Sequence, residues 1–415
     1  MLKMIRTTAS SYSYCSSRRG MPFLYSPSLA ALFHSQSSKP IKFRETQLGK
    51  IARDPPSTPK VNNLEDALKA FDEMLQRRPL PSVVRFTQIL GQLAKLKHYS
   101  AVISLNKKMD QVGIAHDDYT LNIIINCFCH LKQAGLSLSI LGRFFKLGLQ
   151  PDVATANTLI NGYILENRVA EAARLLGKMM EVGRCQPNVF TFNTLIKGFC
   201  MKGNNSAAIQ LLRKMEEIGN CKADIVAYNT IIDGLCKDTL VVDAVNLFSE
   251  MIGRGIAPDV ITYNSLIHRV CKLGKWKEAT RLLNEMASQN IFPDVYTFNV
   301  LVDALCKEGM VVEAEIVVEM MIQREIEPDT ITYSSLMDGY CLRGEMDKAK
   351  KVFDVMVRKG SMVNVFSCNI LIHGYCKHKK IDEAKMVFQE ISRRELVANT
   401  FTYNILIDGS AKQGE

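Results

Sequence analysis

The stretch ITYNSLI at residues 261–267 returns as YTFNVLV at residues 296–302 and as ITYSSLM at residues 331–337. Successive copies begin 35 residues apart, at residues 261, 296 and 331. A fixed period of this length is typical of a solenoid, in which each repeat is one supersecondary unit that packs on its neighbours. This recurring stretch therefore decides the fold class.

The repeat extends well beyond these three copies. With position 1 set three residues before the aromatic residue, ten units begin at Val83, Asp118, Val153, Val189, Ile225, Val260, Val295, Thr330, Val365 and Thr400. The spacing is 35 residues except for two spacings of 36, whose extra residue falls near 184–185 and 220–221, where a loop tolerates insertion. We expect an organelle transit peptide in 1–44, a linker and degenerate half-repeat in 45–82, and the repeat array in 83–415, with its last unit incomplete. An incomplete unit is compatible with a fragment or a truncated paralogue of a longer protein.

Each unit is expected to contain two amphipathic helices. In residues 260–294, apolar residues recur at i, i+3, i+4, i+7 and i+8, on one helical face: Tyr263, Leu266, Ile267, Val270 and Cys271. Gly274 suits a left-handed turn at the end of this helix. A second apolar stripe follows at Trp276, Ala279, Leu282, Leu283 and Met286. Neither helix can bury its face alone, so we expect an all-α, right-handed superhelical solenoid of helix-turn-helix repeats with a concave surface.

The positive charge is concentrated at the amino terminus. The formal net charge is +10, but residues 1–44 hold seven basic residues, ten serines and no acidic residue. Removing those seven leaves 45 basic against 42 acidic residues, a net charge of +3, which disfavours a nonspecific polycation. An acid-free, Ser-rich, Arg-containing segment is typical of a transit peptide, and Lys3 and Arg6 among apolar neighbours favour the mitochondrion over the chloroplast. The alternative is a disordered basic tail.

The composition gives little support to an enzyme, a metal site or a membrane protein. No apolar run approaches the roughly 18 residues of a membrane span. Position 12 carries a cysteine in seven units, which we expect to be a buried, small apolar residue in each layer: Cys129, Cys200, Cys236, Cys271, Cys306, Cys341 and Cys376. The methionines at position 27 are interpreted as core, and His268 and His373 as solvated. We expect no cofactor and no catalysis, and only Cys127-x-Cys129 comes near a metal-ligand spacing.

Two polar positions repeat with unusual regularity. Position 5 is Thr87, Asn122, Asn157, Asn193, Asn229, Asn264, Asn299, Ser334, Asn369 and Asn404. The last position is Asp117, Asp152, Asn188, Asp224, Asp259, Asp294, Asp329, Asn364 and Asn399. Helix capping alone is plausible for the last position, but asparagine inside a helix is unfavourable, so position 5 suggests another use.

Position 2 lies three residues before position 5 on the same helical face. It is Val84, Tyr119, Ala154, Phe190, Val226, Ile261, Tyr296, Ile331, Phe366 and Phe401. One apolar side chain for stacking and two polar groups for a base edge suit one nucleotide per repeat of single-stranded RNA. Lysine at position 13 could contact phosphates or only complement the helix dipole: Lys237, Lys272, Lys307 and Lys377.

The pattern resembles the pentatricopeptide repeat. The residues that carry this resemblance are Val-x-Thr-Tyr-Asn-Thr-Leu-Ile, Cys-Lys near position 12, Glu-Ala near position 19 and Gly-Ile-x-Pro-Asp at the end of the unit, with residues 256–264 a close match. The uniform units look like the P-class, and residues 78–82 and 114–122 are similar to the restorer-of-fertility-like plant subgroup. The resemblance covers residues 64–415.

The resemblance implies a sequence-selective, organellar single-stranded RNA-binding protein that acts in RNA processing, stability or translation. It is expected to be a monomer and not an enzyme, with a processing nuclease or another processing factor as a possible partner. Positions 5 and 35 would choose the base in parallel orientation, which implies a target near GUYUUUUAY, where Y is a pyrimidine. The two 36-residue units leave Asn188 and Asp224 open as the reading positions. The alternative is a tetratricopeptide-like protein scaffold, whose 34-residue period and small residue at position 8 this chain lacks.

Overall fold

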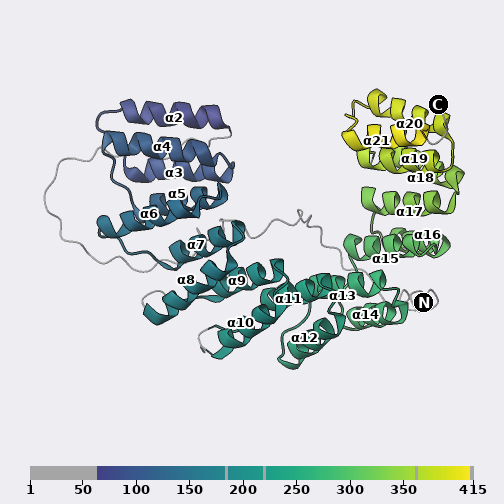
Figure 1. The fold of residues 1–415 in the computed structure, drawn as a ribbon, viewed down its shortest axis with the longest axis horizontal. Helices are drawn as coiled ribbons and strands as arrows, with labels where there is room; N and C mark the ends of the chain where they lie inside the picture. The colour runs from purple at the N-terminus through teal and green to yellow at the C-terminus, as the bar shows by residue number, and fades with distance from the viewer. Residues whose placement is uncertain (1–62, 183–185, 218–220, 360–362, 412–415) are drawn as a thin grey trace. The chain divides into compact units, whose positions relative to one another are not determined.

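The computed structural model describes residues 63–182, 186–217, 221–359 and 363–411, and all regular structure in these ranges is α-helical (Figure 1). The predicted transit peptide at 1–44 lies outside the described residues. The predicted half-repeat consists of a single helix, α2 (Leu64–Gln76). Asn63 caps this helix by accepting a hydrogen bond from the amide of Asp66 at 2.8 Å.

Each predicted unit begins with a helix, and these first helices start at the ten predicted positions. They are α3 (Val83–Lys95), α5 (Asp118–His130), α7 (Val153–Leu165), α9 (Val189–Met201), α11 (Ile225–Lys237), α13 (Val260–Lys272), α15 (Val295–Lys307), α17 (Thr330–Arg343), α19 (Val365–Lys377) and α21 (Thr400–Ala411). The second helices are α4 (Tyr99–Val112), α6 (Ala134–Lys146), α8 (Val169–Val182), α10 (Asn205–Glu217), α12 (Val241–Gly253), α14 (Trp276–Ser288), α16 (Val311–Gln323), α18 (Met346–Arg358) and α20 (Ile381–Arg393). The helix-turn-helix prediction is confirmed.

The chain forms two compact units that divide inside α11, between Thr230 and Ile231. In the first unit, α5 packs on α6 and α7, and α7 packs on α8 and α9. In the second unit, α17 packs on α15, α18 and α19, and α19 packs on α20 and α21. Within each unit, these first helices thus contact their own second helix and the first helix of the next repeat. This arrangement is the all-α repeat solenoid that the period predicts.

The repeat 260–294 shows how the sequence pattern forms the core. The five residues of the predicted first stripe are all buried: Tyr263, Leu266, Ile267, Val270 and Cys271. In α14, Ala279, Leu282 and Met286 are buried, whereas Trp276 and Leu283 are only half-buried. Gly274 has a φ of +65° and follows the end of α13, as predicted. The amide of Lys275 then donates to the carbonyl of Val270 at 2.9 Å and closes the turn.

The position-12 cysteines have a packing role that their burial alone does not reveal. A Cβ atom built on Gly339 would lie 2.6 Å from the Sγ atom of Cys306 in the preceding repeat. The same relation holds between Gly374 and Cys341, at 2.6 Å. At these two junctions the sulfur therefore lies directly against the glycine at position 10 of the next first helix. Because a larger residue would not fit at Gly339 or Gly374 without a shift, these contacts set the separation of the first helices at these two junctions.

Candidate nucleic-acid interface

The apolar residues at position 2 are exposed although they lie in the first turn of their helices. Their exposed fractions run from 45% for Phe190 to 64% for Phe366, and only Ala154 is half-buried. One apolar side chain is thus left in solvent in nearly every repeat, where a base could stack on it. The predicted stacking residues are therefore accessible in the structure.

The residues at the last position cap the first helix of the following repeat. Asp294 accepts a hydrogen bond from the Thr297 amide at 2.9 Å, and the Asp294 amide donates to Thr297 Oγ1 at 3.1 Å. This is a reciprocal capping box. An equivalent acceptor role is seen at every predicted last position: Asp117, Asp152, Asn188, Asp224, Asp259, Asp294, Asp329, Asn364 and Asn399.

The position-5 asparagines connect neighbouring repeats. Asn264 Nδ2 donates to Asp294 Oδ1 at 3.1 Å, and Asn264 Oδ1 accepts from Thr297 Oγ1 at 2.6 Å. Asn299 makes the corresponding bonds to Asp329 and Thr332, at 3.1 and 2.5 Å. Both asparagines are buried, with 7% and 6% exposed. Position 5 therefore has a structural role across the repeat junction that the sequence analysis missed.

The other position-5 residues vary around this arrangement. Asn193 Nδ2 donates to Asp224 at 3.0 Å, and Asn157 Nδ2 lies 3.5 Å from Asn188 Oδ1. The remaining residues differ in their burial or in the partners that they contact. Asn122 Oδ1 accepts a hydrogen bond from Thr155, and the hydroxyl of Thr87 bonds that of Thr120. Three further residues are buried: Asn229, Ser334 and Asn369. Asn404, on α21, is exposed.

The two repeats of 36 residues keep the same geometry at their junctions. Asn188 caps α9, and Asp224 accepts both from the Ala227 amide and from Asn193. These contacts match those of Asp294 in a 35-residue repeat. Asn188 and Asp224 are thus the last-position residues of their repeats.

The lysines at position 13 are exposed near the ends of the first helices, and some of them have acidic partners. Lys237 Nζ lies 2.6 Å from Asp233, and Lys307 Nζ lies 2.7 Å from Asp303. These are i, i+4 ion pairs between exposed groups, which are weak and screened by salt. A phosphate would have to compete with the carboxylates for these two lysines.

The two histidines at position 9 lie in different environments. His373 is exposed, as predicted, but His268 is half-buried, so the prediction of a solvated position is wrong for His268. Its Nδ1 atom lies 3.3 Å from the hydroxyl of Tyr296, and the two rings meet edge to face. Burial is the largest cause that lowers the pKa of His268. The neighbouring imidazole thus supports the exposed Tyr296 ring at position 2.

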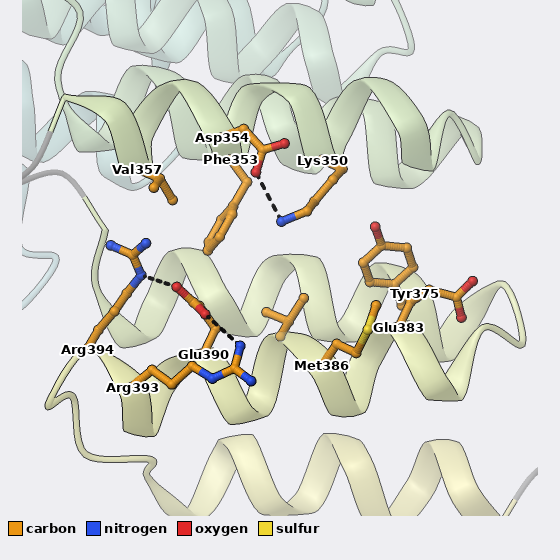
Figure 2. Close-up of a pocket in the computed structure, with 11 residues that line it drawn as sticks. Lys350, Phe353, Asp354, Val357, Tyr375, Glu383, Met386, Glu390, Arg393 and Arg394 are labelled. Carbon is orange, nitrogen blue, oxygen red and sulfur yellow. Dashed lines mark hydrogen bonds and ion pairs between the residues drawn. The ribbon is translucent and has the colours of Figure 1, made fainter.

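A pocket of about 260 Å³ lies on the second helices α18 and α20, away from the positions described above. Figure 2 shows ion pairs among its charged side chains other than Glu383. Lys350 lies 3.0 Å from Asp354, and Glu390 lies 2.9 Å from Arg394. No residue of positions 2, 5 or 35 lines this pocket, so it is not part of the candidate interface.

In the part of the chain that the structure describes, the position-12 cysteines are spread along the stack, one in each of seven repeats. Burial raises the pKa of Cys271, Cys306 and Cys341 to about 12, so these thiols stay protonated near neutral pH. Within the described ranges, no group of three His, Cys, Asp or Glu side chains could hold a metal ion. Among the same residues, no helix is both long enough and apolar enough to cross a membrane.

The fold and the repeated surface define a class, the α-helical repeat solenoids. A sequence model described as the PPR repeat family matches residues 151–201, 187–222, 223–272, 258–307, 293–342, 328–366 and 363–412. Because these matches together span residues 151–412, more than half of the chain, the chain belongs to the PPR repeat family. The resemblance to pentatricopeptide repeats is thereby confirmed, and the helices in 83–150 continue the same pattern.

The chain is also similar to plant proteins of this family. One, a putative mitochondrial pentatricopeptide repeat-containing protein of Arabidopsis thaliana, is 46% identical over 114 residues, which are 28% of this chain and 19% of the relative. Another mitochondrial protein of that plant is 50% identical over 74 residues, or 18% of this chain and 14% of the relative. The matched regions are thus small parts of these relatives. Their location confirms the prediction of a mitochondrial protein.

Solved structures of related proteins share a low sequence identity with this chain. The pentatricopeptide repeat protein PPR10, in complex with an 18-nt psaJ RNA element, is 24% identical with a TM-score of 0.42, over 84% of this chain and 55% of PPR10. PPR10 from maize alone is 20% identical with a TM-score of 0.41, over 86% and 65% of the two chains.

Proposed function

We propose that this protein binds single-stranded RNA in a sequence-selective manner, with one base per repeat. The observation that carries this proposal is the repeated arrangement of an exposed apolar side chain at position 2 beside a polar pair, a mostly buried residue at position 5 and an accessible one at position 35. Bases stack on apolar and aromatic side chains, and amide or carboxylate groups can bond their edges. Membership of the PPR repeat family and relatives in mitochondria support a mitochondrial transcript as the target.

The pairs of positions 5 and 35 give the proposed base order. Thr87/Asp117 is assigned to G, the Asn/Asp pairs to U, the Asn/Asn pairs to C or U, and Ser334/Asn364 to A. Read in parallel orientation, the nine complete pairs give 5′-GUYUUUUAY-3′. The protein would act by occupying this sequence, so that it blocks a nuclease, remodels the RNA or recruits a processing factor.

A protein-binding scaffold of the tetratricopeptide kind is the competing function. The exposed apolar residues at position 2 could also contact a peptide. The hydrogen-bonded pair of Asn264 and Asp294 favours the RNA proposal, because a peptide-binding surface does not require the same amide and carboxylate at each junction.

Binding of fluorescent RNA to the full chain at about 0.15 M salt tests the proposal. We expect tight binding to GUCUUUUAC and much weaker binding to a nine-nucleotide poly-A probe. Salt is needed because residues 1–44 carry seven basic residues, and phosphate binding weakens steeply as salt rises. Equal binding of both probes, or of neither, would exclude the proposed function.

The substitution Asn264→Thr tests the assignment of a single repeat. We expect the preference at the sixth nucleotide to shift from U toward G, by about 1 kcal/mol or more, as is usual for specific base contacts. Asn246→Thr is a matched control, because Asn246 is exposed on the second helix α12. An unchanged preference in Asn264→Thr would limit Asn264 to a structural role.

A further inference from the structure

Position 3 of each repeat carries a threonine or serine in most units, and its side chain faces the preceding repeat. Thr297 Oγ1 lies 2.6 Å from Asn264 Oδ1, and Thr332 Oγ1 lies 2.5 Å from Asn299 Oδ1. Both threonines are fully buried. A hydroxyl that only capped its own helix would not need to reach a side chain of the neighbouring repeat.

The three side chains together fix the orientation of the asparagine amide. A carboxylate only accepts hydrogen bonds, so the Nδ2 atom of Asn264 has to face Asp294. The oxygen of the amide then faces Thr297, which donates to it. Rotating the amide by 180° would place its oxygen against the Asp294 carboxylate and lose that bond, and the Thr297 hydroxyl would have to change from donor to acceptor. We call Asn264, Asp294 and Thr297, and the equivalent residues at the next junction, the Asn–Asp–Thr triad.

Junctions that lack one member of the triad leave the asparagine oxygen without a partner. At Asn193 the aspartate is present, but position 3 of the next repeat is Ala227, and Asn193 Oδ1 is buried with no hydrogen-bond partner. At Asn157 and Asn369 the aspartate is replaced by Asn188 and Asn399, and Oδ1 is again buried without a partner. A buried acceptor without a partner costs about 1–3 kcal/mol and is an unusual feature.

We infer that the position-3 threonine of the following repeat is a positioning residue for base selectivity, and this inference rests on the RNA-binding function proposed above. With Oδ1 held by threonine and one N–H held by aspartate, Asn264 has only its second N–H to offer, which favours a base that presents an acceptor, such as the O4 atom of uracil. At Asn193 no hydroxyl holds the oxygen, which is buried in the free protein, so the amide is less firmly oriented and can shift to accept from the amino group of cytosine. Identical Asn/Asp pairs therefore differ in selectivity.

The test compares RNA probes that differ at one nucleotide, with the full chain as the protein. In GUCUUUUAC, Asn193 reads the fourth nucleotide, Asn264 the sixth and Asn299 the seventh. For the wild type, we expect U→C at the sixth or seventh position to weaken binding about 5-fold or more, as expected for one hydrogen bond. The same change at the fourth position should weaken binding less than about 2-fold, since the amide there is held by the aspartate alone.

Two sets of variants move the selectivity in opposite directions. Ala227→Thr adds the missing hydroxyl and should raise discrimination at the fourth nucleotide to the level of the sixth. Thr297→Val removes a hydroxyl at nearly constant volume and should abolish discrimination at the sixth nucleotide, while the seventh is unchanged. Thr297→Ser, which keeps the hydroxyl, should retain the wild-type selectivity.

The outcomes separate this inference from the proposed function. If the wild type discriminates at the sixth nucleotide and Thr297→Val weakens binding of all probes alike, Thr297 only stabilises its helix and the inference is wrong. Equal discrimination at the fourth and sixth nucleotides in the wild type would also overturn it. If the wild type binds none of these probes selectively, the proposed function itself fails and the inference fails with it.

Discussion

At the scale of single residues, the last position of each repeat performs two tasks. Asp294 caps α15 through the Thr297 amide, and it also accepts from Asn264 of the preceding first helix. In the sequence alone, capping and base reading are alternative interpretations of these residues. The structure shows the capping bonds directly, so a bound base has to use the atoms that capping leaves over.

Substitution of the capping residue should therefore lower stability. Asp294→Ala is expected to reduce the free energy of unfolding by about 0.5–2 kcal/mol, the usual cost of losing an N-cap. Asp294→Asn is the matched control, because Asn188 and Asn364 cap their helices in this same chain. Urea unfolding followed by circular dichroism measures the difference. Equal losses in both variants would show that the charge of Asp294 matters more than its hydrogen bonds.

At the scale of helices, adjacent repeats are held together by contacts between side chains of different repeats. A sequence pattern within one repeat does not predict these contacts. The period and the apolar stripes were sufficient to place all ten first helices at their correct starts. The contact of Cys306 with Gly339 could not be predicted in this way, since it joins two repeats and depends on their separation. The regular Cys at position 12 and the frequent Gly at position 10 were the available signal.

The close contact at Gly339 predicts a sharp intolerance to a methyl group. Gly339→Ala should destabilise the protein by about 1–3 kcal/mol, the typical cost of overpacking. Cys306→Ala should relieve this loss only in part, because the Cβ atom of Cys306 would still lie 2.7 Å from the new methyl group. Chemical denaturation monitored by circular dichroism or by Trp276 fluorescence would measure both effects.

Gly177→Ala in α8 is the control for helix propensity, because a Cβ atom there has no neighbour within 4 Å. This substitution should be neutral or stabilising, since alanine favours helices over glycine by about 1 kcal/mol. If Gly339→Ala were as stable as Gly177→Ala, the proposed spacing role of the cysteine–glycine contact would be wrong.

At the scale of the whole molecule, the buried thiols make stability depend on alkaline pH. Burial raises the pKa of five cysteines to about 12, from an ordinary value of 9.0: Cys127, Cys236, Cys271, Cys306 and Cys341. The folded state therefore favours the protonated thiols. Their contribution is complete below pH 9 and is lost as the pH rises toward 12.

We expect the free energy of unfolding to fall between pH 9 and pH 11, by up to about 1.4 kcal/mol per pH unit for each such thiol. Urea unfolding at a series of pH values measures this slope. The double variant Cys306→Ala and Cys341→Ala should show a smaller slope than the wild type. Tyr263, whose pKa burial also raises to about 12, adds to the fall above pH 10 in both proteins.

The sequence predicted the family, the fold and the identity of the candidate pairs, because each depends on residues within one repeat. It did not predict which position-5 amides have complete hydrogen bonding. That property depends on position 3 of the following repeat, as the contrast between Ala227 after Asn193 and Thr297 after Asn264 demonstrates. The half-buried state of His268 likewise results from the Tyr296 ring of the next repeat.

The hydrogen bonds across the junctions have a consequence for building new proteins from these repeats. A cassette cut at the helix start, between Asp294 and Val295, would separate Asn264 from the Thr297 that bonds its amide. Recombination after position 4, beyond Thr297 and Phe298, would transfer the three side chains together. Designers who exchange specificity modules should therefore place the splice inside the first helix and not in the loop before it.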